Sequence, residues 1–306
     1  MVGAFALAVA SSGCGLGAGE PTQGEATLSV TRDYGSGQLL KATETEPAET
    51  ETVIRMLDRE AEITTRYGGG FVQSIEGIEG ETAAGRSYDW FFFVNGIEAS
   101  TGAAEAQVRG GDRIWWDYRD WTNALRTPAV VGSWPEPFLQ GSAGSDRIPV
   151  RIECFGKRAP CNEVRDTLAE QGVEASIETA ASGGPSSLRV LVGRWEEVRS
   201  DPLAKNLAQG PEVSGVFARF AARQGSGWSL QALDERAEVA AEYEAGAGLV
   251  AAMRDGEKPA TWLVAGVDAA GVDEAVAALD DSHLVDRYAV AADAGGDSAV
   301  PVGATE

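Results

Sequence analysis

Residues 88–121 read YDWFFFVNGIEASTGAAEAQVRGGDRIWWDYRDW and contain the densest aromatic runs of the chain. The first run, WFFFV at 90–94, ends at Asn95-Gly96, and the second, IWWDY at 114–118, follows a Gly-Gly-Asp turn sequence. Aromatic and β-branched residues favour strands, whereas Asn-Gly and Gly-Gly break a strand into turns. The pattern therefore predicts two strands on which the surrounding chain is organised.

Successive side chains of a strand point to opposite faces of its sheet. One face of these two strands would carry Trp90, Phe92, Val94, Ile114, Trp116 and Tyr118. The other face would carry Phe91, Phe93, Trp115, Asp117 and Arg119. Because both faces are largely apolar, one can form a core, and the other needs cover from another layer, a ligand or a partner.

Several motifs around these strands are shared with a known family. They are YGGGFV at 67–72, IEGI at 75–78, WFFFVNG at 90–96, Gly102-Ala103 and GDRIWWDY at 111–118. Together they resemble the transcobalamin-like C-terminal domain family over residues 26–122. In the vertebrate vitamin B12 carriers, such a domain closes over the corrinoid from one side and a separate helical domain closes from the other. No such helical domain is recognisable in this sequence, so the resemblance implies ligand binding first and cobalamin only second.

The length and charge of the chain limit how many domains it can have and which partners it can bind. At 306 residues it is long enough for two domains with separate cores. The net charge of -22 and the isoelectric point near 4.4 argue against nucleic acid as a partner, because phosphate binding needs clustered Lys and Arg. The same charge is unsuited to adsorption on anionic lipid.

The N-terminus predicts export. MVGAFALAVA at 1–10 is an apolar run of the length of a signal-peptide h-region, too short to span a bilayer. The SSGC that follows resembles a bacterial lipoprotein processing site, with Cys14 as the lipidated residue; the alternative is a simple secretory signal cleaved nearby. Either interpretation exports the protein, and the first anchors it by lipid at the outer face of the cytoplasmic membrane or in the cell envelope. Residues 1–25 would then be signal peptide, processing site and a flexible tether.

The remaining cysteines, Cys154 and Cys161, lie seven residues apart in a predicted strand-to-helix loop. An oxidising compartment favours a structural disulfide between them. A redox-active or metal-binding pair would want CxxC spacing, a third sulfur or nearby His, and the sequence has none of these. Free thiols are the remaining alternative.

Residues 26–122 are predicted to form a first domain of α+β class. Alternating apolar residues predict strands at 26–32 and 38–43, helical spacing predicts a helix at 50–63, and strands resume at 71–75. Two strands, a helix and then several strands is the order of a β-grasp-like fold, with the helix across one sheet face.

Residues 123–147 are rich in Pro and Gly and are expected to be a linker arm, with Trp134 and Phe138 anchored to this chain's own domains or to a partner. Residues 148–293 alternate strands and helices, which predicts a second, α/β layered domain. Its expected elements include a strand at 188–192, a helix from 246 to 254, a strand at 262–267 and a last strand at 284–291. Residues 294–306 are expected to be a disordered tail.

Catalytic and metal chemistry find little support in the sequence. The single His, His283, leaves no zinc site built on two or three His. Asp117 and Asp120 beside tryptophans would suit sugar chemistry, yet 47 acidic residues make such neighbours common by chance. We therefore expect no enzyme, no metal and no obligatory cofactor.

The sequence favours a non-catalytic, extracytoplasmic binding lipoprotein that captures a small molecule for a membrane transporter, with a corrinoid as the ligand implied by the family resemblance. The alternative is an envelope protein whose aromatic face recognises another protein or packs on its own second domain. The residues expected to contact a ligand are Trp90, Phe92, Trp115, Trp116, Tyr118 and Trp121.

Overall fold

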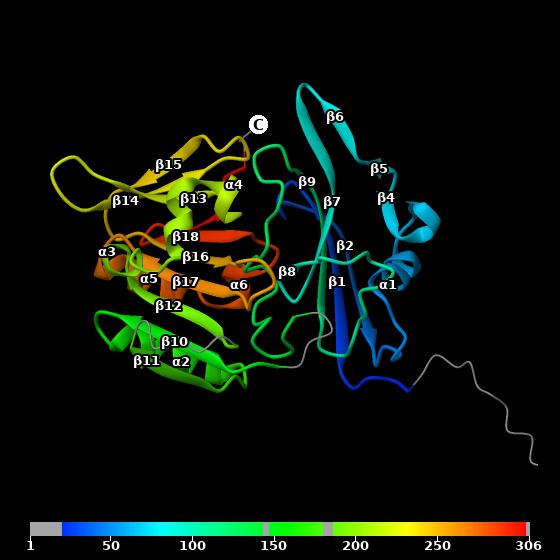
Figure 1. Cartoon of the computed structure of the whole chain (residues 1–306), viewed down its shortest axis with the longest axis horizontal. Helices are drawn as coiled ribbons and strands as arrows, with labels where there is room; N and C mark the ends of the chain where they lie inside the picture. The colour runs from blue at the N-terminus through cyan, green and yellow to red at the C-terminus, as the bar shows by residue number, and fades with distance from the viewer. Residues whose placement is uncertain (1–19, 143–146, 180–185, 304–306) are drawn as a thin grey trace, which may run out of the picture.

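The computed structural model describes residues 20–142, 147–179 and 186–303. The expected lipidation residue, Cys14, lies outside the described residues. Figure 1 shows two parts side by side, with β7 and β9 of the first part running along their junction. The structure mixes α and β elements in several sheets, in agreement with the α+β class at the coarse level.

The first part is built on a sheet with strand order β2-β1-β9-β7-β6, in which β8 also pairs with β7. β1 lies parallel to β9 and antiparallel to β2, and β7 is antiparallel to its neighbours. The strands are β1 (Glu25–Arg32), β2 (Gly37–Thr45), β6 (Glu81–Ala83), β7 (Arg86–Val94), β8 (Ile97–Glu98) and β9 (Arg113–Asp120). The two predicted aromatic strands are therefore direct neighbours, paired through Phe92 and Trp116.

One face of this sheet is covered by α1 (Val53–Glu60) and by a small sheet of β3 (Ile63–Arg66), β4 (Phe71–Ile75) and β5 (Ile78–Glu79). The 3-10 turn η1 (Tyr67–Gly69) joins β3 to β4. Buried α1 residues at helical spacing, Val53, Met56 and Leu57, meet the sheet residues Leu28, Val30, Ile114 and Trp116. The sheet's outer face thus has a core of its own.

The Pro-rich arm is buried between the two parts. Residues 129–138 are all buried, and Trp134 and Phe138 pack on Trp262 of the second part, with ring centroids 5.6 and 5.0 Å away. The arm therefore belongs to the protein's own core, as one of the two sequence interpretations had it. The arm holds the two parts together by side-chain packing as well as by the continuous backbone.

The second part is built on a seven-stranded sheet with order β11-β10-β12-β17-β16-β18-β19. The strands are β10 (Val150–Phe155), β11 (Ala175–Thr179), β12 (Leu188–Arg194), β16 (Gly248–Met253), β17 (Thr261–Gly266), β18 (Ala289–Asp293) and β19 (Gly296–Val300). β11, β10, β12 and β17 run parallel, and β16 is antiparallel to both of its neighbours.

Helices cover one face of this sheet and a second small sheet covers part of the other. The helical face has α2 (Ala159–Glu170), α5 (Ala269–Ala277) and α6 (Asp281–Leu284). The opposite face has α3 (Trp195–Val198), η2 (Ala204–Gln209), α4 (Pro211–Ser214), β13 (Ala218–Ala222), β14 (Trp228–Leu233) and β15 (Val239–Tyr243).

Three predictions for the C-terminal half are wrong. The helix expected from 246 to 254 is strand β16, every residue of which is buried. A strand buried on both faces needs an unbroken apolar run, and GLVAAM supplies one, so tertiary packing overrides the helical preference of its alanines. The expected disordered tail contains β19, which pairs antiparallel with β18, and the last strand expected at 284 begins only at Ala289.

Cys154 at the end of β10 and Cys161 in the first turn of α2 form a disulfide. The predicted pairing is confirmed. The bridge closes the short loop from β10 into α2 and ties the sheet to the helix that covers it.

None of the helices in the described residues has the length and apolar character needed to cross a membrane.

Candidate functional site

The paired strands β7 and β9 divide their aromatic side chains between the two faces, as the alternation predicts. On the α1 side, Phe92 stacks on Trp116 with ring centroids 4.7 Å apart, and Trp90 lies 5.3 Å from Tyr118. Trp90, Trp116 and Tyr118 are buried, whereas Phe92 is half-buried. Most of the predicted ligand contacts on this face are therefore part of the first core.

The opposite face of the two strands is closed by the second part. The ring of Tyr288 lies 5.2 Å from Trp115 and 5.7 Å from Phe93, both in edge-to-face geometry. Such aromatic pairs favour association beyond the area that they bury. Trp115, which was expected to contact a ligand, is thus buried between the two parts.

A buried hydrogen-bond network lies among these rings. Asp117, wholly buried, accepts from the Tyr288 hydroxyl at 2.9 Å, the Thr31 hydroxyl at 2.6 Å and the Gly35 amide at 3.0 Å. The indole N–H of Trp115 donates to the Thr31 hydroxyl at 2.8 Å. Burial raises the pKa of Asp117 to about 6 and raises that of Tyr288 well above its ordinary value. The network fixes the two parts together rather than offering a reactive group to solvent.

The outer edge of β7 borders a cleft of about 290 Å³. β6 pairs with one end of β7 and β8 with the other, and over residues 89–92 no strand in the described residues pairs with this edge. The cleft is lined by Gly70, Phe71, Val72, Trp90, Phe91, Phe92, Glu98, Ala99, Thr101, Gly102, Ala103, Trp116 and Arg126. Of the six predicted contacts, it brings together Trp90, Phe92 and Trp116.

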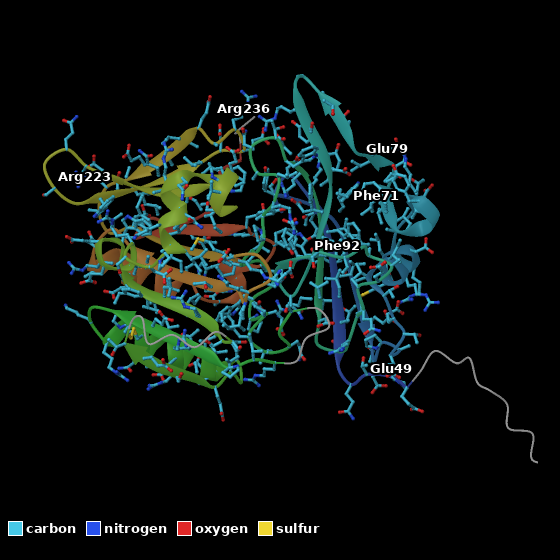
Figure 2. All side chains as sticks on the ribbon, in the orientation of Figure 1. Glu49, Phe71, Glu79, Phe92, Arg223 and Arg236 are labelled. Carbon is cyan, nitrogen blue, oxygen red and sulfur yellow. A yellow bond between two sulfur atoms is a disulfide. The ribbon has the colours of Figure 1, made fainter. Side chains whose placement is uncertain are left out.

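Two exposed aromatic side chains lie beside this cleft: Phe71 lines it, and Tyr67 packs against Phe71. Phe71 is 42 % exposed and Tyr67 is 88 % exposed, and their rings meet edge to face at 6.4 Å. Figure 2 shows Phe71 on the outer side of the first part, on the far side of the sheet from the second part. The sequence linked YGGGFV to the family resemblance but did not predict Tyr67 or Phe71 as a contact. Whether an aromatic side chain at the start of a strand or in a turn is exposed depends on how the elements pack.

A second hollow, of about 450 Å³, lies beside the first, and Phe71 lines both. Trp121 and Tyr88 line this second hollow together with Tyr67 and Gln73. Trp121, a predicted contact, is half-buried there. Tyr118 lines neither hollow; its hydroxyl donates to the Glu79 carbonyl at 2.9 Å, and burial raises its pKa to about 12.

The turns that hold the aromatic strands are fixed by Asn95 and Asp112. The Asn95 amide donates to Asp112 at 2.8 Å and to the Gly141 carbonyl at 2.9 Å, while its oxygen accepts from the Arg113 amide at 2.8 Å. Both side chains are buried. The ends of β7 and β9 are therefore held rigidly, with the arm included in the same network.

Charge at the cleft is balanced. Glu98, buried, is paired with Arg126 at 2.5 Å and accepts from the Thr127 amide. Arg119 lies over the Phe91 ring, 3.9 Å from its centroid, in a cation–π contact. A ligand in the cleft would meet aromatic faces and one ion pair.

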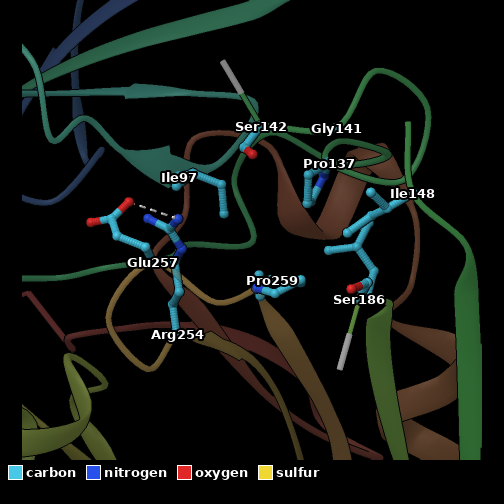
Figure 3. Close-up of a pocket in the computed structure, with 11 residues that line it drawn as sticks. Ile97, Pro137, Gly141, Ser142, Ile148, Ser186, Arg254, Glu257 and Pro259 are labelled. Carbon is cyan, nitrogen blue, oxygen red and sulfur yellow. Dashed lines mark hydrogen bonds and ion pairs between the residues drawn. The ribbon is translucent and has the colours of Figure 1, made fainter. Parts of the chain in front are cut away.

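A further pocket, of about 260 Å³, lies where the first part, the arm and the β16–β17 turn meet (Figure 3). Ile97, Pro137 and Pro259 give it apolar walls, and Arg254 is paired with Glu257 at 3.2 Å on one side. Its walls come from segments that pack the two parts together, and none of the six predicted contact residues lines it. We regard it as a packing gap between the parts.

His283 lies on α6, where its ring is paired with Asp280 at 2.7 Å. Among the described residues, no three His, Cys, Asp or Glu side chains are grouped so that they could hold a metal ion. The Asp280 carboxylate also accepts from the backbone of His283, so this pair forms the start of α6.

Comparison with known proteins adds one match. A family described as "Domain of unknown function (DUF4430)" matches residues 50–120, which include α1, the small outer sheet and both aromatic strands. A search of curated proteins finds no match to the chain. The match therefore identifies the segment that carries the cleft as a recurring domain.

Proposed function

We propose that the protein is a non-catalytic binding lipoprotein of the bacterial cell envelope, whose first domain captures a small molecule with a flat apolar face at the β7 cleft. The observation that carries this proposal is the exposure of Phe71 between two hollows whose walls include Trp90, Phe92, Trp116 and Trp121. Ligand sites are typically concave and lined by aromatic side chains with few polar groups.

A transcobalamin-like, β-grasp-like fold for the first domain is part of this proposal. It is supported by the order of two strands, a helix and further strands, and by the position of α1 across one sheet face. A cleft of about 290 Å³ holds one edge of a corrinoid rather than the whole ring. A macrocycle lying across Phe71 would reach both hollows at once.

The carboxyl groups with the most strongly raised pKa values lie away from the cleft at β7. Asp117 and Glu136 are buried in the junction of the two parts and line none of the hollows described above. Burial also raises the pKa of Asp89, which lines the second hollow and accepts from the Trp90 amide. Catalytic acids and bases need contact with a substrate in a cleft. Export is supported by the signal-like residues 1–10 and by the disulfide, which oxidising compartments favour.

The proposal is tested by equilibrium dialysis of the full chain against cyanocobalamin, haem and riboflavin. We expect one of these to bind, and Phe71→Ala to weaken its affinity by about tenfold or more, the loss typical of an aromatic anchor. Leu39→Ala is the matched control, because Leu39 is similarly exposed at 37 % but lies on β2 at the other edge of the sheet. Absence of binding by all three compounds, or equal loss in both variants, contradicts capture at this cleft.

The second candidate function is recognition of an extended segment of another envelope protein. It is favoured by the outer edge of β7 between β6 and β8, where no described strand pairs, because a strand edge flanked by aromatic pockets can accept an added strand. An added strand would displace the Asp89 carboxylate from the Trp90 amide and would meet the Phe92 carbonyl already bonded to the Ala99 amide. A photo-crosslinking residue at Tyr67, compared with one at Leu39, tests it in cells. A discrete adduct that forms only from position 67, with none of the three compounds bound, would favour this function.

A further inference from the structure

The second part has a crevice of its own, of about 720 Å³, at the carboxyl ends of three parallel strands. Its walls are the loops that leave β10, β12 and β17 and the first turns of α2 and α5. The lining residues are Phe155, Gly156, Lys157, Ala159, Pro160, Glu163, Gly193, Arg194, Glu197, Asp268, Ala269, Val272 and Asp273. The volume falls within the range usual for small-molecule sites.

The crevice lies at the point where the strand order of the sheet reverses. From β10 the chain passes through α2 to β11 on one side, and it then returns to β12 on the other side of β10. The loops leaving β10 and β12 therefore diverge and leave a gap between them. In open sheets of this kind, ligands bind in the gap outside the carboxyl ends of the strands at such a reversal.

Local backbone features fix the wall of the crevice between β10 and β12. Gly193 has φ +156°, and a Cβ there would lie 2.3 Å from the Phe155 carbonyl oxygen, so only glycine allows β12 and β10 to approach so closely. The Cys154–Cys161 disulfide closes the loop that carries Gly156, Lys157 and Ala159. A wall held in this way loses little conformational freedom when a ligand binds.

The rim of the crevice carries charges of both signs that lack partners. Lys157, Glu163 and Asp273 are exposed, and none of them forms an ion pair with any described residue. Arg194, by contrast, is paired with Glu197 at 2.6 Å. A ligand that pairs with rim groups of both signs carries both a cation and an anion.

The acidic excess disfavours phosphates, which bind many crevices of this topology. Four carboxylates line the crevice against two cations, and one of the four, Asp268, caps α5 by accepting from the Gly271 amide at 2.9 Å. The β10–α2 loop has a single glycine, Gly156, in place of a glycine-rich phosphate cradle. Phe155, Pro160 and Val272 give the crevice an apolar floor.

We infer that this crevice binds a zwitterionic amino acid or short peptide with an apolar side chain. The ammonium group is placed toward Glu163 and Asp273, the carboxylate toward Lys157, and the side chain on the apolar floor. The site is separate from the cleft at β7 and does not depend on the function proposed for it.

Isothermal titration calorimetry of the full chain with L-alanyl-L-phenylalanine tests the inference. We expect the dipeptide to bind, and its N-acetylated and C-amidated forms to bind about tenfold more weakly or worse, because each lacks one of the two charges. Inorganic phosphate should not bind. Asp273→Asn should weaken the dipeptide and leave the affinity for its N-acetylated form unchanged.

Ala269→Trp should abolish dipeptide binding, because Ala269 is exposed at the start of α5 and lines the crevice. Ala270→Trp is the matched control, since Ala270 is the exposed next residue and does not line the crevice. Absence of dipeptide binding by the unmodified chain, or equal binding by the two tryptophan variants, overturns the inference. Neither result bears on the titrations at the β7 cleft.

Discussion

Asp117 joins the two parts through a single buried carboxyl group. Burial raises its pKa to about 6, against the opposing effect of the hydrogen bonds from Thr31, Tyr288 and Gly35. In the unfolded chain an aspartate titrates near its ordinary value of about 3.9. Between these two values the folded chain keeps a proton that the unfolded chain has released, so this group's contribution to stability falls as the pH rises from about 4 to 6.

Asp117→Asn removes that dependence and keeps a side chain of the same shape. Relative to the unmodified protein, we expect the variant to gain on the order of 3 kcal/mol in free energy of unfolding between about pH 4 and pH 7. Urea unfolding at several pH values measures the difference. Glu60→Gln, at an exposed position on α1, is the control and should give a curve parallel to that of the unmodified protein. If the stability of Asp117→Asn also ran parallel to that of the unmodified protein across this pH range, the raised pKa of Asp117 would be contradicted.

At the scale of elements, the Cys154–Cys161 bridge holds β10 to α2. A cross-link over so short a loop removes conformational freedom from the unfolded chain and stabilises the fold by about 2 to 3 kcal/mol. We expect the double variant Cys154→Ala/Cys161→Ala to lose that amount in chemical unfolding, and reductant to have the same effect on the unmodified chain. Reductant should leave the stability of the double variant unchanged. A further loss of stability there would show that reductant acts on something other than this disulfide.

Helices and strands were predictable where the local sequence pattern favours the same structure as the packing of the folded chain. β1, β7, β9, β12 and β17 follow from aromatic, alternating or unbroken apolar runs, and α1 follows from helical spacing. β16 was not predictable, because an alanine-rich run buried on both faces carries no period that separates strand from helix. β19 was missed since its polar residues depend on β18 for pairing.

The site was predictable only in part, for a similar reason. The two-face division of the aromatic strands follows from alternation, and with it the grouping of Trp90, Phe92 and Trp116. Which face stays open depends on where Tyr288 lies, far along the chain. The crevice at β10 and β12 depends on strand order, which local sequence does not encode.

At the scale of the whole molecule, the two parts share one continuous apolar cluster, which contains Phe93 and Trp115 as well as Leu191 and Leu263. Gly35 is a point of closest approach: a Cβ there would lie 1.8 Å from the Asp286 carbonyl oxygen. The two parts should therefore unfold together as one cooperative unit.

Gly35→Ala tests this contact against a matched control. Gly35 has φ +85° and Gly85 has φ +80°, yet a Cβ at Gly85 meets no atom within 4 Å. Gly85→Ala should lose only the conformational cost, about 1 kcal/mol, whereas Gly35→Ala should lose at least about 2 kcal/mol more by forcing the parts away from one another. Thermal unfolding followed by near-ultraviolet circular dichroism measures both. Equal losses of stability in the two variants would show that the junction accommodates a methyl group at position 35 without further cost.

The contact between Asp117 and Tyr288 spans 171 residues of sequence. Synthesis runs from the N-terminus, so the first domain is made long before Tyr288, which packs on Phe93 and Trp115. Exposed apolar faces on incomplete chains promote aggregation. The packing of the first domain is thus completed by residues near the C-terminus, and a chain that ends before Tyr288 lacks these contacts of Phe93 and Trp115.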